Sequence, residues 1–182
     1  MTRALLIIAC SQRKTAGMAA GAAWDVYDGV VYRVLKKRLG TRDNWPAWFD
    51  VLIVSAKYGV IRPGRKIHTY DQTMPRNGPP GRWAGTLRDL VAGSDYRFVH
   101  INLGRAYKAA IGDMAGLFPN ADVTAAAGGI GQRAAQTAAW VGSRLKTSRT
   151  LQPPSSRPRT EVGSRPGTRR RNPPGGTPRA RA

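Results

Sequence analysis

The chain has 182 residues and a formal net charge of +20, a length that favours one domain with an appendage over two full domains. A single cysteine, Cys10, excludes an internal disulfide framework and a cysteine-based zinc cluster. The two histidines, His68 and His100, are too few for a His-rich metal site, and no apolar run approaches the ~20 residues of a membrane span. We therefore expect a cytoplasmic protein with no metal or cofactor.

Charge and composition divide the chain near residue 145. Residues 146–182 contain nine arginines and Lys146 against one acidic residue, Glu161, together with seven of the 13 prolines. A segment rich in Arg, Pro, Gly and Ser has almost no apolar surface with which to offset the entropy of ordering. We expect a folded domain over residues 1–145 and a disordered basic tail over residues 146–182.

The first half of the domain begins with an apolar run at residues 5–9, which is typical of a buried parallel strand. Apolar residues at helical spacing in the second half of 19–39 predict a helix that stops at Gly40. Residues 50–55 predict a second buried strand. Residues 56–80 include four prolines and predict a long loop, and such loops in compact domains are often functional.

The second half continues the alternation of helices and strands. The predicted elements are a helix over 81–91, a strand over 97–103, a helix over 105–117, a weaker strand over 121–125 and a closing helix over 131–145. This order predicts an α/β fold, a single three-layer domain whose mostly parallel sheet has about four strands flanked by helices. Ligands bind beyond the carboxyl ends of the strands in such sheets, so the loops that leave those ends are the expected site.

The loop after the first strand carries groups that suit a phosphate. Cys10, Ser11 and Lys14 offer backbone amides, a hydroxyl and a cation. The loop lacks the glycines of a P-loop, so nothing here indicates nucleoside triphosphate binding. A solvated basic turn explains the same residues. A nucleophilic Cys10 would need a nearby base, and neither histidine is visibly placed for that.

The long loop after the second strand is the richest in chemical groups. Tyr58 or Tyr70 would stack on a nucleobase, Lys57 would hold a phosphate, and Ser55 supplies a hydroxyl to the same loop. Asp71 would orient a water or stabilise a developing cation. The structural alternative is that the two tyrosines are aromatics at the edge of the core and that Asp71 caps a turn.

Other polar positions lie near predicted strand ends or helix starts. Tyr27 and Asp28 precede the first helix, and Asp28 is expected to cap its N-terminus. Asn102 ends the third strand, where its amide would read a base edge. Arg133 follows a glycine cluster and would face an anion near a helix N-terminus, although the glycines also suit a tight turn. His100 lies within a strand and is expected to be a hydrogen-bonded core residue.

The excess of arginine in the tail favours contact with nucleic acid, because flexible basic arms bind phosphate backbones without reading sequence. We expect DNA rather than RNA as the partner. A purely solubilising arm is the alternative. A membrane partner is not expected, since no apolar anchor accompanies the charge. The sequence does not indicate an oligomeric state.

Four colinear segments of the domain resemble the YaaA-like (peroxide-stress protein) superfamily, and most closely a small uncharacterised bacterial and phage domain family related to it. The segments are residues 6–11 with Lys14, 26–32, 52–63 with Tyr70 and Met74, and 101–103 with Tyr107. The resemblance implies that the domain shares the fold of this superfamily. Members of the superfamily are associated with DNA binding and with protection against peroxide damage through restraint of free iron. Related domains occur beside machinery that makes or removes modified bases in DNA and tRNA.

The leading hypothesis is a nucleic-acid-associated protein that acts on a base or nucleotide, with chemistry at an N-glycosidic bond. The catalytic candidates are Asp71, Lys57 and Tyr58, and the substrate-binding candidates are Cys10, Ser11, Lys14, Tyr27, Ser55, Tyr70, Asn102 and Arg133. The alternatives are a non-catalytic DNA-binding protein of the peroxide-stress type and a small-nucleotide transferase. The sequence leaves open whether the chain is an enzyme.

Overall fold

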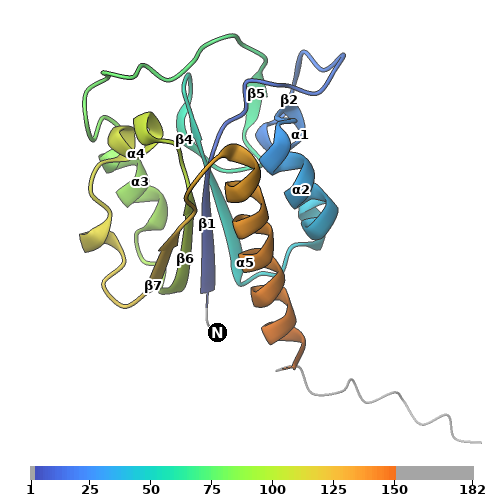
Figure 1. Cartoon of the computed structure of the whole chain (residues 1–182), viewed down its shortest axis with the longest axis vertical. Helices are drawn as coiled ribbons and strands as arrows, with labels where there is room; N and C mark the ends of the chain where they lie inside the picture. The colour runs from blue at the N-terminus through green and yellow to red at the C-terminus, as the bar shows by residue number, and fades with distance from the viewer. Residues whose placement is uncertain (1–2, 151–182) are drawn as a thin grey trace, which may run out of the picture. The chain divides into compact units, whose positions relative to one another are not determined.

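The computed structural model describes residues 3–150. Its main sheet has the strand order β4-β3-β1-β6-β7 (Figure 1). Four strands run parallel, and these are β1 (Arg3–Ala9), β3 (Phe49–Ser55), β6 (Tyr96–Asn102) and β7 (Asp122–Ala125). The prediction of an α/β fold with a mostly parallel sheet is confirmed. The sheet has five strands rather than about four, because β4 (Gly59–Ile61) pairs antiparallel with β3.

Helices cover both faces of this sheet. α2 (Val30–Leu39) and α5 (Ile130–Thr150) lie on one face, and α3 (Ala84–Val91) and α4 (Arg105–Ile111) lie on the other (Figure 1). Successive side chains of a strand point to opposite faces. Leu6 and Ile8 of β1 therefore pack in the cluster that contains Leu35 of α2, and Leu5 and Ile7 pack in the cluster on the α3 and α4 side.

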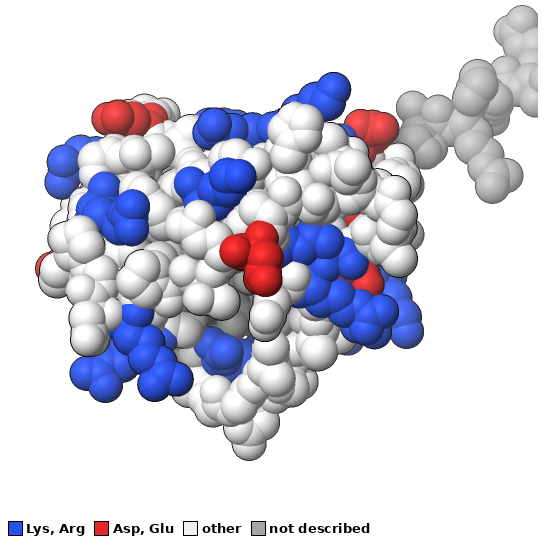
Figure 2. Space-filling model, turned by 90° about the horizontal axis from the view of Figure 1, so that it is seen from above, with Lys and Arg blue, Asp and Glu red and all other residues white. Residues whose placement is uncertain are grey.

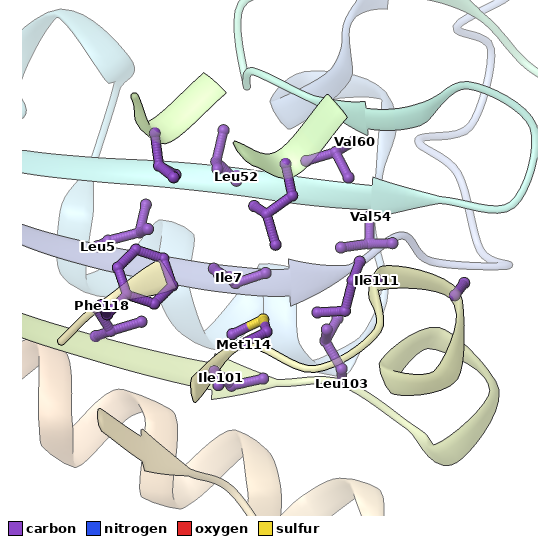
Figure 3. Close-up of a cluster of buried hydrophobic side chains, with 14 of the residues drawn as sticks. Leu5, Ile7, Leu52, Val54, Val60, Ile101, Leu103, Ile111, Met114 and Phe118 are labelled. Carbon is purple, nitrogen blue, oxygen red and sulfur yellow. The ribbon is translucent and has the colours of Figure 1, made fainter. Parts of the chain in front are cut away.

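The cluster on the α3 and α4 side fills the space between helices and sheet (Figure 3). Its side chains come from β1, β3, β6, α3 and α4 and from the segment that follows α4, and include Leu5, Ile7, Leu52, Val54, Ile101, Ile111, Met114 and Phe118. The apolar runs at residues 4–9 of β1 and 51–54 of β3 are explained by the burial of both faces of these strands.

Besides β4, three further short elements were not predicted. β2 (Ala20–Ala22) and β5 (Lys66–His68) pair antiparallel as a separate two-stranded sheet, and α1 (Ala23–Val26) follows β2 directly. The segment expected to be a loop, 56–80, therefore contains two strands, β4 and β5. Each is three residues long, which is too short for an alternating pattern to be recognised.

Several boundaries also differ from those predicted. The helix expected over 105–117 ends at Gly112, whose φ of 73° stops α4, and a 3₁₀ turn follows at Ala115–Leu117. A second 3₁₀ turn lies at Arg42–Asn44, after α2 has ended at Gly40 as predicted. α5 extends past residue 145 to Thr150, so the first residues assigned to the tail belong to this helix. The remainder of the predicted tail lies outside the described residues. Between residues 3 and 150, no helix combines the length and the apolar character that a bilayer crossing needs.

Candidate nucleotide site at the carboxyl end of the sheet

The order of the strands reverses at β1. The chain adds β3 on one side of β1 and then crosses to add β6 on the other side. Loops that leave neighbouring strands at such a reversal diverge, and this is where open α/β sheets bind ligands. Cys10 follows β1 at this point, and its Sγ lies 3.2 Å from the Tyr107 hydroxyl of α4, the helix after β6.

Three hydroxyl groups form a hydrogen-bonded cluster at the end of β3, which we call the hydroxyl cluster: Tyr27, Ser55 and Tyr70. The Tyr70 hydroxyl lies 2.7 Å from Ser55 Oγ and 2.9 Å from the Tyr27 hydroxyl. The Tyr27 hydroxyl donates to Ser55 Oγ at 3.2 Å. The backbone N–H groups of Lys57 and Tyr58 also donate to Ser55 Oγ, at 3.3 and 3.2 Å. Residues more than 40 positions apart are thereby joined at one point.

Burial keeps these phenols protonated. It raises the pKa of Tyr27 to about 12 and raises the pKa of Tyr70 and of Tyr107 above the ordinary tyrosine value, with the neighbouring Cys10 adding to both effects. At neutral pH each group is therefore a hydrogen-bond donor as well as an acceptor. The cluster offers neutral polar groups and no negative charge to a ligand.

Two ammonium groups lie beside the ring of Tyr70. Lys14 Nζ is 4.5 Å from the ring centroid, and Lys57 Nζ is 5.7 Å from it and 5.5 Å from the centroid of Tyr58. The two rings meet edge to face with centroids 5.4 Å apart. Figure 2 views the domain from this end, and Lys and Arg side chains occupy more of this face than Asp and Glu do. Cations and aromatic faces together suit a nucleotide.

Asp71 is held next to the hydroxyl cluster by its two neighbours in the chain. Tyr70 contacts Ser55, and Gln72 Nε2 donates to the Ala56 carbonyl at 3.1 Å, so both flanking residues are fixed to consecutive residues at the end of β3. The Asp71 side chain is exposed. Among the residues that the structure describes, it forms no hydrogen bond or ion pair, so the turn-capping alternative has no contact to support it.

Asn102 and Arg133 form a separate group. The Asn102 side chain is only 4% exposed, and its Nδ2 donates to Thr137 Oγ1 at 2.9 Å and to the Arg133 carbonyl at 3.4 Å. The amide nitrogen is thus used inside the fold. The Arg133 guanidinium lies close to Gly104 at the start of α4, and none of its described contacts reaches the hydroxyl cluster.

Two expectations for single residues have clear outcomes. His100 is a hydrogen-bonded core residue as predicted, with ring nitrogens 2.8 Å from Thr124 Oγ1 and 3.2 Å from Thr137 Oγ1. The prediction that Asp28 caps α2 is wrong, because the N-cap position is Gly29 and no side chain caps it. The Asp28 carboxylate instead forms ion pairs with Arg13 at 3.2 Å and Arg33 at 3.6 Å.

Ser11 lies against the start of α2. Its Oγ occupies the space that a Cβ on Gly29 would need, so the loop after β1 packs directly on the helix backbone. Cys10, Lys14, Tyr27, Ser55, Lys57, Tyr58 and Tyr70 are brought together at the hydroxyl cluster. Ser11 contacts the start of α2, while Asn102 and Arg133 form their own separate group.

Tyr107 belongs to the site but was not among the predicted site residues. It lies in the first turn of α4, just after the loop that leaves β6. The sequence signal that could have identified Tyr107 is its position in the first turn of the helix that follows a strand-end loop.

No group of three or more His, Cys, Asp or Glu side chains that could hold a metal ion occurs within the described part of the chain. No protein-family model and no curated protein matches this sequence.

Proposed function

We propose that this chain is a nucleic-acid-associated protein that binds a base or nucleotide at the carboxyl end of its sheet and acts there on an N-glycosidic bond. The observation that carries the proposal is the position of Lys14 and Lys57, whose ammonium groups lie 4.5 and 5.7 Å from the ring centroid of Tyr70, a member of the hydroxyl cluster. The ammonium groups supply the positive charge that a phosphate requires. The half-buried rings of Tyr58 and Tyr70 supply the aromatic surface on which a base would stack.

Asp71 is the residue to which we assign the chemistry. Departure of a base breaks the bond between C1′ and the base nitrogen, and the electron pair leaves with the base. The sugar is left with oxocarbenium character, which a nearby carboxylate stabilises or quenches by activating a water. Asp71 is available for this role because its neighbours are anchored while its own carboxylate forms no hydrogen bond or ion pair with the described part of the chain.

The resemblance to the YaaA-like superfamily is consistent with this assignment and stays part of the proposal. The segments that carry the resemblance, 6–11, 26–32 and 52–63, supply Cys10, Tyr27, Ser55, Lys57 and Tyr58. These residues converge at the hydroxyl cluster although they are distant in sequence. An association of related domains with base modification or removal in DNA favours base chemistry over a free-nucleotide transferase.

The test is the variant Asp71→Asn, assayed for release of free base from DNA that contains a panel of modified bases. We expect turnover to be lost while DNA affinity is nearly unchanged, because the substitution keeps the shape and removes the charge that stabilises the transition state. Asp89→Asn, an exposed carboxylate on α3, is the matched control and should retain activity. A fully active Asp71→Asn variant, or one that loses affinity and turnover together, would overturn the assignment.

A non-catalytic DNA-binding protein is the second candidate, and the net charge of +20 favours it. Truncation after Thr150 keeps α5 whole and removes eight arginines and Glu161. The salt slope of duplex binding should fall by about 0.9 for each phosphate that the truncated chain no longer neutralises. Binding retained by the truncated chain supports a nucleic-acid site in the folded domain. Complete loss of binding would mean that the basic segment alone holds DNA.

A further inference from the structure

A groove of about 610 Å³ runs along the edge of the sheet, away from the hydroxyl cluster. It exists because β4 is short and pairs with β3 only from Ile53 to Ser55. The residues at the start of β3, from Phe49 to Val51, line the groove, and no described strand pairs with them on that side. The opposite wall is residues 62–65, which connect β4 to β5. The volume falls within the ~300–1,000 Å³ of typical ligand sites.

The charge of this groove is positive. Arg42, Arg62 and Arg65 line it, and Asp50 is its one acidic lining residue. Asp50 is neutralised by the ion pair with Arg3 and accepts a hydrogen bond from the Tyr96 hydroxyl.

Two of these arginines are available to an anion. Arg42 approaches Asp25 at 3.8 Å, whereas Arg62 and Arg65 have no carboxylate partner among the described residues. Arg62 uses one Nη to donate to the Leu90 carbonyl at 3.2 Å, which fixes its position and leaves further donors. The groove therefore suits an anionic ligand, and it does not suit the chain's own basic segment at residues 152–182.

An unbroken series of contacts joins the groove to the hydroxyl cluster. The Arg65 guanidinium lies 5.8 Å from the centroid of the Tyr58 ring, and Tyr58 meets Tyr70 edge to face. The Tyr58 hydroxyl is also anchored, since it donates to the His68 carbonyl at 3.2 Å. Lys14 lies on Tyr70 at the far end of the series. A ligand that occupies the site can thus continue past Tyr58 into the groove while remaining in contact with basic side chains.

We propose that the groove holds the phosphodiester backbone of a single nucleic-acid strand that flanks the nucleotide in the site. This inference rests on the proposed function and specifies its substrate as a single-stranded polymer rather than a free nucleotide. The guanidinium groups of Arg62 and Arg65 match phosphate geometry. A strand that follows this path must turn from the end of the sheet onto its edge. A duplex is stiff over about 150 base pairs, whereas a single strand bends readily.

The test compares thymidine 5′-monophosphate with oligothymidylates of about 4 to about 16 nucleotides, the range of known single-strand site sizes. The full chain and the variant Arg62→Gln/Arg65→Gln are titrated at several salt concentrations. Arg88→Gln/Arg97→Gln, which removes two exposed arginines of α3 and β6, is the matched control. Because Arg62 contacts the Leu90 carbonyl, Arg65→Gln alone is included, and a thermal melt of each variant verifies folding.

We expect affinity to rise with oligonucleotide length in the unmodified chain. The variant Arg62→Gln/Arg65→Gln should bind the longest oligonucleotide roughly tenfold more weakly, with a salt slope lower by about 1.4 because each phosphate contact on a single strand contributes about 0.7. Its affinity for the mononucleotide and the behaviour of the control should be unchanged. Affinity that does not depend on length, or equal losses in variant and control, would overturn the proposal. Polyglutamate that displaces the oligonucleotide from the groove at a lower concentration than unlabelled oligothymidylate does would also overturn it, because the groove would then prefer an acidic peptide.

Failure of the proposed function has a different signature. The variant Lys14→Ala/Lys57→Ala removes the cations at the hydroxyl cluster and leaves the groove intact. If this variant binds the mononucleotide as tightly as the unmodified chain does, the proposed nucleotide site at the hydroxyl cluster is wrong. The groove still stands in that case, provided that Arg62→Gln/Arg65→Gln weakens binding of the longest oligonucleotide.

Discussion

The Sγ of Cys10 lies 3.2 Å from the hydroxyl of Tyr107, and this contact joins the end of β1 to the helix that follows β6. These are the two strands between which the order of the sheet reverses. Tyr70 lies close enough to Cys10 for the pKa of its phenol to be raised by it, so the reversal point is continuous with the hydroxyl cluster. Groups that follow β1 and β3, the side chains of Tyr27 and Tyr70, and Tyr107 of α4 therefore meet at one end of the sheet.

The hydroxyl of Tyr70 should contribute measurably to stability. In Tyr70→Phe, Ser55 Oγ and the Tyr27 hydroxyl each lose a buried hydrogen-bond partner. We expect the free energy of unfolding to fall by about 1–2 kcal/mol, since a typical intramolecular hydrogen bond contributes about 0.5–1.5 kcal/mol. Urea denaturation measures the change. Tyr58→Phe removes a hydroxyl whose partner is the exposed backbone of His68, so a cost as large as that of Tyr70→Phe would contradict this interpretation.

The close approach of Ser11 to α2 predicts an energetic coupling between two residues. A Cβ at Gly29 would collide with Ser11 Oγ, so Gly29→Ala should destabilise the protein by about 1–3 kcal/mol, as overpacking usually does. Ser11→Gly should relieve most of this cost in the double variant, and a double-mutant cycle of unfolding free energies measures the coupling.

A second glycine provides the control. Gly85 lies in α3, and no atom lies within 4 Å of the position that a Cβ would take there, so Gly85→Ala should stabilise the protein by about 0.5–1 kcal/mol. If Gly29→Ala raises the free energy of unfolding as Gly85→Ala is expected to, the inferred close packing of the loop after β1 on α2 is wrong.

The buried histidine predicts a loss of stability in acid. Burial lowers the pKa of His100 to about 4, against 6.5 for an unperturbed histidine. Between these values the unfolded chain binds a proton that the folded protein does not bind. The free energy of unfolding should therefore fall by about 3 kcal/mol as the pH decreases from about 6.5 to about 4. Urea titrations across this range measure the change.

A comparison of variants of the two histidines distinguishes the contribution of His100 from other effects of acid on stability. His100→Gln should flatten the pH dependence of stability between about pH 4 and 6.5. His68 is exposed, and His68→Gln should retain the full dependence. An unaltered slope in His100→Gln would mean that another group takes up the proton.

The elements that could be predicted from sequence are those whose pattern is long enough to recognise. Residues 5–9 and 51–54 are continuous apolar runs, and β1 and β3 lie there in the structure. β4 and β5 are three residues each, and their pairing depends on segments far away in the chain. The groove could not be predicted for the same reason, because it results from the length difference between β3 and β4.

The candidate site was partly predictable because parallel strands end at the same edge of a sheet. That rule predicts that Cys10, Ser55 and the residues after β3 lie in one region, and contacts in the structure join them. It could not distinguish Asn102, whose amide is directed to Thr137 inside the fold, from a residue that faces a ligand. It also missed Tyr107, which reaches the site from a helix rather than from a strand-end loop.

The most direct measurement is the affinity of the full chain for thymidine 5′-monophosphate and single-stranded DNA in two variants of equal charge. Lys14→Ala/Lys57→Ala removes the ammonium groups beside Tyr70. Lys37→Ala/Arg97→Ala removes two exposed cations, from the last turn of α2 and the start of β6. A nucleotide site at the hydroxyl cluster predicts a loss of affinity of roughly tenfold in the first variant, if each cation contributes a charge-assisted contact, and little change in the second. Equal losses in the two variants would show that net charge alone holds the nucleic acid and would contradict a site at the end of the sheet.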